Sequence, residues 1–357
     1  MKRRTLLGVV CLLAVTLMGV ARVSAAEKFN VDPNQVIPKP DGKEADMSKP
    51  VQVFILMGQS NMCGMGNVSK LEEVVKGGKY PYLVDDAGKW SERKDVRNIN
   101  TVNGSLNIPK RPVTNGPLTI QAPFVGVDQP IGHILGNMFD APVLLIKCAN
   151  GNRSLGFDLL PPGSEPYEFE GKMEPGYCGT PADPKLDGKA AGRKGKGSYG
   201  GWEYDINVQT AKKILADIGK YYPGATKYEV AGFFYWQGEN DGNPAWAQRY
   251  ELNMANFIKA VRKDFAAPNA KFVLATMGEA TKGSGGSGGK ILDAQLAVDG
   301  NSGKHPEFKG NVATVYSNPM SKGGKGQGHY GGNPEVYMDI GEAMGRAMAE
   351  LLKKETH

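Results

Sequence analysis

The chain has 357 residues, 40% of them hydrophobic, which suits one large globular domain or two small ones. Its formal net charge is +6, but four basic residues and no acidic residue lie within positions 1–25. Without that segment, 39 basic residues (43 less four) face 37 acidic ones. The remaining charge of +2 is too small to indicate nucleic acid or a membrane surface as a partner.

Residues 1–25 are predicted to form a signal peptide. A basic start at Lys2 to Arg4 precedes an apolar run from Leu6 to Val20 and a small-residue cleavage site at Val23 to Ala25. The apolar run is short for a membrane span and no later segment is long enough, so we expect no stable membrane insertion. The sequence therefore predicts an exported protein, secreted or periplasmic after cleavage of the signal peptide.

Three cysteines remain once Cys11 has left with the signal peptide, namely Cys63, Cys148 and Cys178. An odd number leaves at least one unpaired thiol in a monomer. Export allows a Cys148–Cys178 disulfide, but the sequence does not determine the connectivity. None of the spacings is C-x-x-C, so we expect no structural zinc site.

The rest of the chain is predicted to comprise a tail or linker over residues 26–49 and a single domain over residues 50–357. Five apolar runs rich in β-branched and aromatic residues predict buried parallel strands. These runs are Val51 to Met57, Pro142 to Lys147, Tyr228 to Trp236, Lys271 to Met277 and Val312 to Tyr316. Helical patterns lie at Pro130 to Phe139, Ile206 to Tyr222, Pro244 to Phe265 and Pro334 to Lys354. This alternation predicts an α/β fold, with a five-stranded parallel sheet covered on both faces.

Three segments lack periodicity and are predicted to be long loop insertions. Residues 67–123 are irregular, with turn signals at several glycines. Residues 161–201 are rich in Gly, Pro and Lys, and we expect a surface loop over the site. Residues 283–289 read GSGGSGG, which predicts a flexible connection.

Small polar turns follow the strands, where open α/β sheets bind their ligands. Gly58-Gln59-Ser60-Asn61 follows the first strand, and Ser60 there could act as a nucleophile whose own N–H faces an oxyanion. Two alternatives remain open at this point. Ser60 or Asn61 could simply cap a helix. A phosphate-binding loop is the other, but neither of its glycine motifs is present.

A base and polar partners follow from the later turns. His329 lies between glycines past the last strand, where its imidazole could approach Ser60 as a general base. His133 lies inside a helical pattern and is expected to be a packed or solvated residue. Gln237 and Glu239 follow the third strand and point to the same side of an extended segment. The alternative for these two is an ordinary polar turn.

Together, Gly58-Gln59-Ser60-Asn61-Met62, Trp236-Gln237-Gly238-Glu239 followed by Asp241, and the late His329-Tyr330 resemble the SGNH (GDSL-like) hydrolase superfamily. The resemblance is greatest to the sialate O-acetylesterase-type branch, which includes carbohydrate esterase family six. It spans about Pro50 to Leu352.

The resemblance implies a three-layer α/β/α flavodoxin-like fold and removal of acetyl groups from sugars. It implies Ser60 as the nucleophile, and an oxyanion hole made by the N–H groups of Ser60 and of Gly151 or Asn152 with the side chain of Gln237. The family usually has two glycines where this chain has Gly151-Asn152, so the identity of the backbone donor stays open.

The sequence departs from the family pattern before His329. The family commonly places an aspartate three residues earlier to orient the histidine, and this chain has Gly326 there. The branch has also been interpreted with the glutamate of the Trp-Gln-Gly-Glu motif as the acid, which makes Glu239 the first substitute and Asp241 the second.

The sequence thus predicts a secreted serine esterase acting on an acetylated oligo- or polysaccharide. We expect no metal and no organic cofactor, and no nucleic acid as a partner. A non-catalytic carbohydrate-binding protein on a degenerate esterase fold is the alternative, because the aspartate of the triad is missing. A lipase or thioesterase is a further alternative, but no broad apolar lid is visible.

Overall fold

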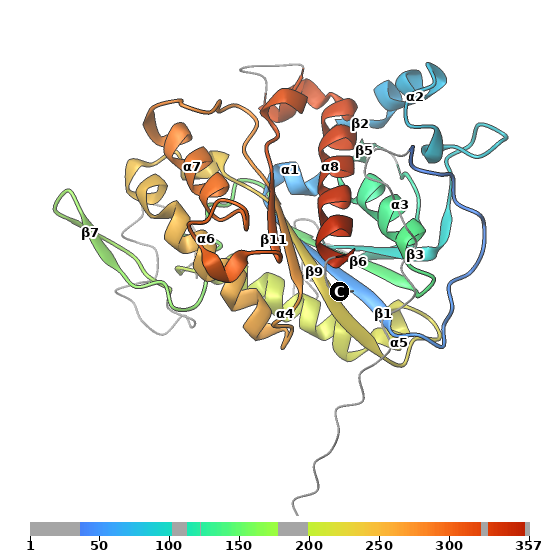
Figure 1. The fold of residues 1–357 in the computed structure, drawn as a ribbon, viewed down its shortest axis with the longest axis horizontal. Coiled ribbons are helices and arrows are strands. Elements are labelled where there is room, and N and C mark those ends of the chain that lie inside the picture. The colour runs from blue at the N-terminus through green and yellow to red at the C-terminus, as the bar shows by residue number, and fades with distance from the viewer. Residues whose placement is uncertain (1–35, 102–112, 122, 178–198, 323–327, 354–357) are drawn as a thin grey trace, which may run out of the picture.

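The computed structural model describes residues 36–101, 113–121, 123–177, 199–322 and 328–353 (Figure 1). A seven-stranded sheet with the strand order β11-β10-β9-β1-β6-β3-β4 forms its centre. The strands are β1 (Val51–Gly58), β3 (Arg93–Asn100), β4 (Thr114–Leu118), β6 (Val143–Ala149), β9 (Tyr228–Trp236), β10 (Lys271–Ala275) and β11 (Val312–Val315). All five predicted strands are present, and they are neighbours and parallel.

The predicted number of five strands is wrong, because β3 and β4 extend the sheet beyond β6. β3 runs parallel to β6, and β4 runs antiparallel to β3. Both lie in residues 67–123, which we expected to be irregular. Only Val96 and Ile99 of β3 are buried apolar side chains, so no continuous apolar run marks this strand. Its polar side chains find partners instead, as Asn98 does with Asp128 at 2.7 Å.

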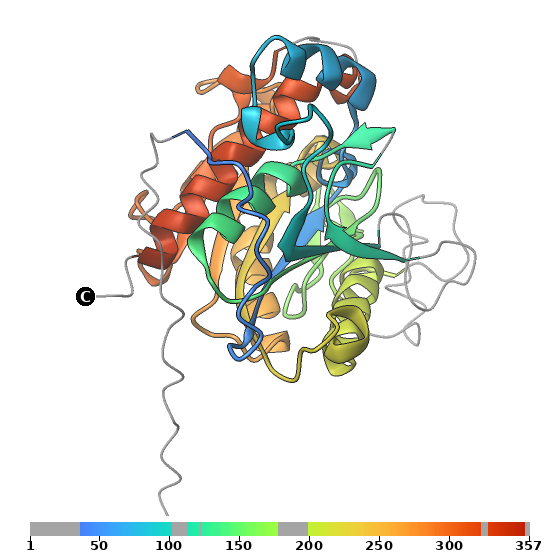
Figure 2. The ribbon, with the colours of Figure 1, turned by 90° about the vertical axis from the view of Figure 1, so that its right-hand side faces the viewer.

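Helices cover both faces of the sheet, which confirms the three-layer α/β/α fold. On one face lie α3 (Asp128–Met138) and α8 (Pro334–Lys353), and on the other lie α4 (Trp202–Ala216) and α6 (Pro244–Asp264) (Figures 1 and 2). Helix α7 (Gly286–Ala297) packs beside α6.

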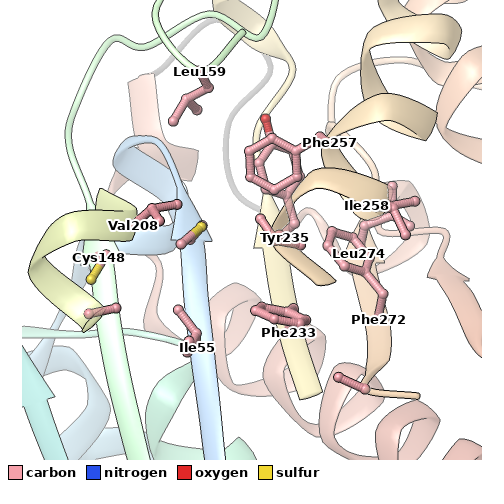
Figure 3. Packing of buried hydrophobic residues seen from close by; sticks show 14 of the residues in the cluster. Ile55, Cys148, Leu159, Val208, Phe233, Tyr235, Phe257, Ile258, Phe272 and Leu274 are labelled. Atoms are coloured by element: carbon pink, nitrogen blue, oxygen red, sulfur yellow. The ribbon is translucent and has the colours of Figure 1, made fainter. Parts of the chain in front are cut away.

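The central strand shows why both faces need cover. Side chains alternate along a strand, so Val53 and Ile55 join the core on the α4 and α6 side while Phe54 and Leu56 join the core on the α3 and α8 side. All four are fully buried. Figure 3 shows Ile55 in the first of these cores, with Phe233 and Tyr235 from the neighbouring strand.

The predicted helices are confirmed, with one divided into α4 and the short α5 (Ile218–Tyr221). The smaller elements are α1 (Ser60–Cys63), α2 (Val68–Lys76) and the short strand pairs β2 (Gly66–Asn67) with β5 (Phe124–Val125) and β7 (Tyr167–Phe169) with β8 (Lys172–Glu174). None of the helices in the described part of the chain is long and apolar enough to span a membrane.

Two expected loops contain regular structure. The β7–β8 hairpin lies within residues 161–201, of which 178–198 fall outside the described ranges. The segment expected to be flexible at residues 283–289 ends inside α7, which begins at Gly286. The apolar side chains that follow explain the helix, because Ile291 and Leu292 are fully buried.

The predicted signal peptide lies outside the described residues. The described end of the expected tail packs on the domain, because Ile37 is buried and the N–H of Asp46 donates to the carbonyl of Asp140 at 2.8 Å. Cys63 and Cys148 are free thiols, and burial raises the pKa of each to about 12. Cys148 therefore forms no disulfide in this structure. Cys178, its possible partner, lies outside the described residues.

Candidate active site

The register of the three central strands brings their polar turns to one point. Gly58 at the end of β1 lies opposite Ala149 of β6 on one side and Trp236 of β9 on the other. Ser60 and Gly151 each lie two residues beyond these paired positions. The turn after β1 is therefore flanked by the turns after β6 and β9.

Gly58 has to be a glycine because the neighbouring strand is too close for a side chain. A β-carbon at this position would lie 2.2 Å from the carbonyl oxygen of Trp236. The same oxygen accepts a hydrogen bond from the N–H of Gln59 at 3.1 Å. The turn that presents Ser60 is thus fixed directly on the end of β9.

Ser60 is the first residue of helix α1 and is half-buried. Its hydroxyl makes no capping hydrogen bond, and neither does any other side chain at this helix start, so the capping alternative does not account for it. A β-carbon placed on Gly151 would lie 3.9 Å from the Cβ of Ser60. The structure therefore brings Ser60 and Gly151 together, as the oxyanion arrangement requires. Asn152 follows with a left-handed φ of 58°.

Glu239 makes its hydrogen bonds with the turn that carries the serine. Its carboxylate accepts from the side-chain amide of Asn61 at 2.8 Å and from that of Gln59. Burial raises the pKa of Glu239 to about 7, and the nearby charge of Glu279 adds to this effect. Glu239 therefore holds both residues that flank Ser60.

Asp241 has a different task, in the loop after β6. It is fully buried and accepts hydrogen bonds from the N–H groups of Leu155 at 2.8 Å and Gly156 at 2.7 Å. The side chain of Gln237 donates to it at 2.6 Å. Burial raises the pKa of Asp241 to about 6. Asp241 thus ties the turn after β9 to the loop that begins at Gly151.

Gln237 does not offer a free N–H group to Ser60 in this structure. An amide group has two N–H donors, and here one donates to the carbonyl of Arg153 at 2.9 Å and the other to Asp241. Its side-chain oxygen accepts from Tyr250 at 2.8 Å, and the residue is fully buried. The oxyanion role that the sequence suggested for Gln237 conflicts with this geometry, which instead makes the residue a support of the loop.

His329 lies in a turn with left-handed backbone, with φ of 56° at both His329 and Tyr330. The ring of Tyr330 stacks on that of Trp236, with centroids 6.1 Å apart, which places this turn over the end of β9. His329 is half-buried. Within the described ranges, no hydrogen bond or ion pair joins its imidazole to Ser60, Glu239 or any other residue.

The expected triad is therefore only partly assembled. The structure places Ser60 with Gly151 and Glu239 with the serine turn, but it brings neither Glu239 nor Asp241 to His329. Gly326, where the family has its aspartate, lies outside the described residues. His133 is fully buried against the ring of Tyr82, as expected for a packed histidine, and burial holds its pKa well below the usual value.

Sequence reasoning missed the amides of Gln59 and Asn61 as the partners of Glu239. It also missed a pair at the candidate oxyanion loop, in which the half-buried guanidinium of Arg153 donates to the buried Glu203 at 3.2 Å. The sequence did contain a signal for the pairing of Glu239, because the side-chain amides of Gln59 and Asn61 each need a hydrogen-bond acceptor. Among the residues described, no group of three or more His, Cys, Asp and Glu side chains is arranged to hold a metal ion.

One protein family matches the second half of the chain. Residues 196–349 match the family described as carbohydrate esterase, sialic acid-specific acetylesterase. This part of the chain is thus similar to carbohydrate esterases of the sialate O-acetylesterase type. The match confirms the resemblance seen in the sequence, and with it the prediction of an enzyme of the carbohydrate acetylesterase class. A search of curated proteins finds no match.

A solved structure of a carbohydrate acetylesterase shares the fold of this chain. A carbohydrate acetylesterase from Xanthomonas citri has a TM-score of 0.52 at 13% identity, over 86% of this chain and 57% of that one. This chain thus spans little more than half of that enzyme. A protein from Arabidopsis thaliana has a TM-score of 0.48 at 18% identity, over 84% and 98% of the two chains. The structure of NanS has a TM-score of 0.46 at 14% identity, over 89% of this chain and 99% of that one.

Proposed function

We propose that the protein is a secreted serine esterase that removes O-acetyl groups from carbohydrates through an acetyl-enzyme intermediate. The observation that carries this proposal is the position of Ser60 beside Gly151, at the strand ends of a chain that matches a carbohydrate esterase family. Ser60 is the nucleophile in this proposal, and His329 is the general base.

In the first half of the reaction, the hydroxyl oxygen of Ser60 bonds to the acetyl carbon while its proton passes to His329. The bond from the acetyl carbon to the sugar oxygen then breaks, and that oxygen takes the proton from His329. In the second half, water attacks the acetyl group, gives a proton to His329, and acetate leaves as Ser60 regains its proton.

The oxyanion in both halves needs donors close to Ser60. The N–H of Ser60 is suited to this role because the first N–H groups of a helix have no partner within the helix. The N–H of Gly151 or Asn152 is the second donor in our proposal, supported by the short distance of 3.9 Å between a β-carbon built on Gly151 and the Cβ of Ser60. Gln237 contributes indirectly, because it holds the carbonyl of Arg153 and so the loop that follows these donors.

The test is acetate release from acetylated oligosaccharides and from p-nitrophenyl acetate, by the wild-type protein and by Ser60→Ala. We expect Ser60→Ala to lose about 10⁶-fold in kcat, as serine hydrolases do without their nucleophile. A variant that kept a tenth of the wild-type turnover would refute Ser60 as nucleophile. Binding of the oligosaccharides without any acetate release would favour the non-catalytic alternative.

Export is a separate part of the proposal, supported by the basic start, apolar run and small-residue site in residues 1–25. The test is expression of the full chain in a bacterial host with mass measurement of the protein from the periplasm or medium. We expect a mature chain that begins near residue 26. Retention of the uncleaved chain inside the cell would contradict export.

A further inference from the structure

A pocket of about 560 Å³ lies beside the helix that carries Ser60. Its wall includes Cys63, the last residue of α1, which lies one helical turn beyond Ser60. The pocket extends from there along the ends of β3 and β4 to β5. The pocket and Ser60 are thus joined by the single turn of α1.

The charged side chains described around the pocket are paired with each other. Its two charged side chains are Lys147 and Asp128, which pair with each other at 2.8 Å and are both buried. Lys147 also donates to the carbonyl of Cys63 at 3.0 Å, and Asp128 also accepts from Asn98 at 2.7 Å. Because both charges are used within the protein, an anionic or cationic ligand would find no free counter-charge among the described residues that line the pocket.

The other polar side chains described around the pocket are neutral amides and hydroxyls, among them Thr114, Thr119 and Gln121, and apolar side chains such as Ile120 and Val125 lie between them. An apolar ligand would bury such groups without hydrogen-bond partners, which is costly. Phe124 lies at the same pocket and is 50% exposed, one of the few large apolar side chains left to solvent in the described ranges. Neutral hydrogen-bonding groups beside an exposed aromatic ring suit a ligand that has both hydroxyl groups and apolar faces.

We propose that this pocket is a subsite for uncharged sugar units next to the acetylated one, with one sugar ring against Phe124. The proposal rests on the proposed esterase function for its position beside Ser60. It makes the enzyme one for neutral acetylated oligosaccharides, in preference to a single acidic sugar. Hydroxyl groups of the bound units pair with the amides and hydroxyls of the wall.

Gly116 offers a way to fill the pocket without touching Ser60. It lies opposite Asn98 in the β3–β4 pair, so a side chain there would share the face on which Asn98 reaches Asp128. Its neighbour Asn115 points to the other face, where its amide donates to the carbonyl of Tyr221 at 2.9 Å. A β-carbon at Gly116 meets nothing within 4 Å. Gly116→Trp should therefore direct an indole ring toward the pocket, with no clash at its β-carbon.

The experiment compares kcat/KM on acetylated xylotriose with kcat/KM on p-nitrophenyl acetate, which is too small to reach the pocket. The ratio of the two should fall about tenfold in Phe124→Ala and in Gly116→Trp, as expected for loss of an aromatic contact. Tyr228→Ala is the matched control, because Tyr228 is 43% exposed at the start of β9, the opposite end of the sheet. Its ratio should stay at the wild-type value. An unchanged ratio in both pocket variants would refute the subsite.

A binding measurement separates failure of the subsite from failure of the proposed function. Calorimetric titration of the Ser60→Ala protein with deacetylated xylotriose needs no catalysis. We expect binding that weakens about tenfold when Gly116→Trp is added. Equal binding with and without Gly116→Trp, or no binding to either protein, would overturn the subsite, whatever the esterase assays show. Absence of acetate release by the wild-type protein would instead refute the proposed function.

Discussion

The side-chain amide of Asn61 donates a hydrogen bond of 2.8 Å to the carboxylate of Glu239, and so joins the residue after Ser60 to the turn after β9. Gln59, on the other side of the serine, donates to the same carboxylate. This arrangement makes Glu239 a positioning residue for the serine turn, acting on Ser60 through its two neighbours.

Glu239→Gln should lower kcat about 10²-fold, the cost of displacing a catalytic group by about 1 Å. The carboxylate accepts from two amides, and an amide in its place would turn its own N–H donors toward one of them. Asn61→Ala should give a loss of similar size, because it removes the other end of the same contact. The measurement is kcat on p-nitrophenyl acetate. A loss near 10⁴-fold in Glu239→Gln alone would instead mark Glu239 as the acid that orients His329.

Gln237→Ala should lower kcat and also the free energy of unfolding, the latter by about 1–3 kcal/mol. The reason is that removal of the amide leaves the carbonyl of Arg153 and the carboxylate of Asp241 without one of their buried donors. Urea unfolding followed by circular dichroism measures the second effect. A large fall in kcat with unchanged stability would restore Gln237 to the role of a direct oxyanion donor.

His329→Ala should remove most of the activity, with kcat reduced by about 10⁴-fold or more, because the proton of Ser60 would lose its acceptor. His305→Ala is the matched control. His305 pairs with Glu251 at 3.1 Å and packs on Phe308, apart from the serine turn. We expect the control to keep the wild-type kcat. Wild-type turnover in His329→Ala would contradict its role as base.

Stability should fall as the pH rises from about 5 to 8, because burial raises the pKa of Glu239 to about 7 and that of Asp241 to about 6. Both groups lose their protons at lower pH in the unfolded chain, so the folded state holds more protons in this window. Unfolding then becomes easier as the pH rises. The measurement is the urea midpoint at pH 5, 6, 7 and 8.

The control for this pH effect is Glu239→Gln, which has no proton to lose at that position. The difference in unfolding free energy between wild type and variant should shift in favour of the variant as the pH rises through about 7. A difference that stayed constant across the four pH values would contradict the raised pKa of Glu239.

Much of the fold was readable from the sequence because the five central strands are buried on both faces. A strand such as Val51–Gly58 then has to be apolar along its whole length. β3 was missed because its polar side chains pair with α3 and with neighbouring loops, which is a property of the folded structure alone. Helix α7 was hidden by the glycines at its start, although its buried side chains come later.

The candidate site shows a similar division. The motifs located Ser60 and the turn after β9, because a polar turn after a buried strand stands out in any sequence. They could not show that the side-chain amide of Gln237 donates to both Arg153 and Asp241, since the carbonyl of Arg153 belongs to another loop. The same holds for the pairing of Glu239 with Gln59 and Asn61. Whether any carboxylate orients His329 stays a prediction to be tested.

The position of β1 in the middle of the sheet has a consequence for how the chain folds. Its partner β6 follows some ninety residues later, and β9 follows about half the chain length later. Such distant pairings are slow to form, because a long stretch of chain has to be closed before any contact is gained. Both edges of this apolar strand stay open until then, and open apolar edges invite aggregation. We therefore expect this strand to be prone to aggregation until β9 has been made, and the turn that presents Ser60 to be among the last parts of the molecule to become ordered.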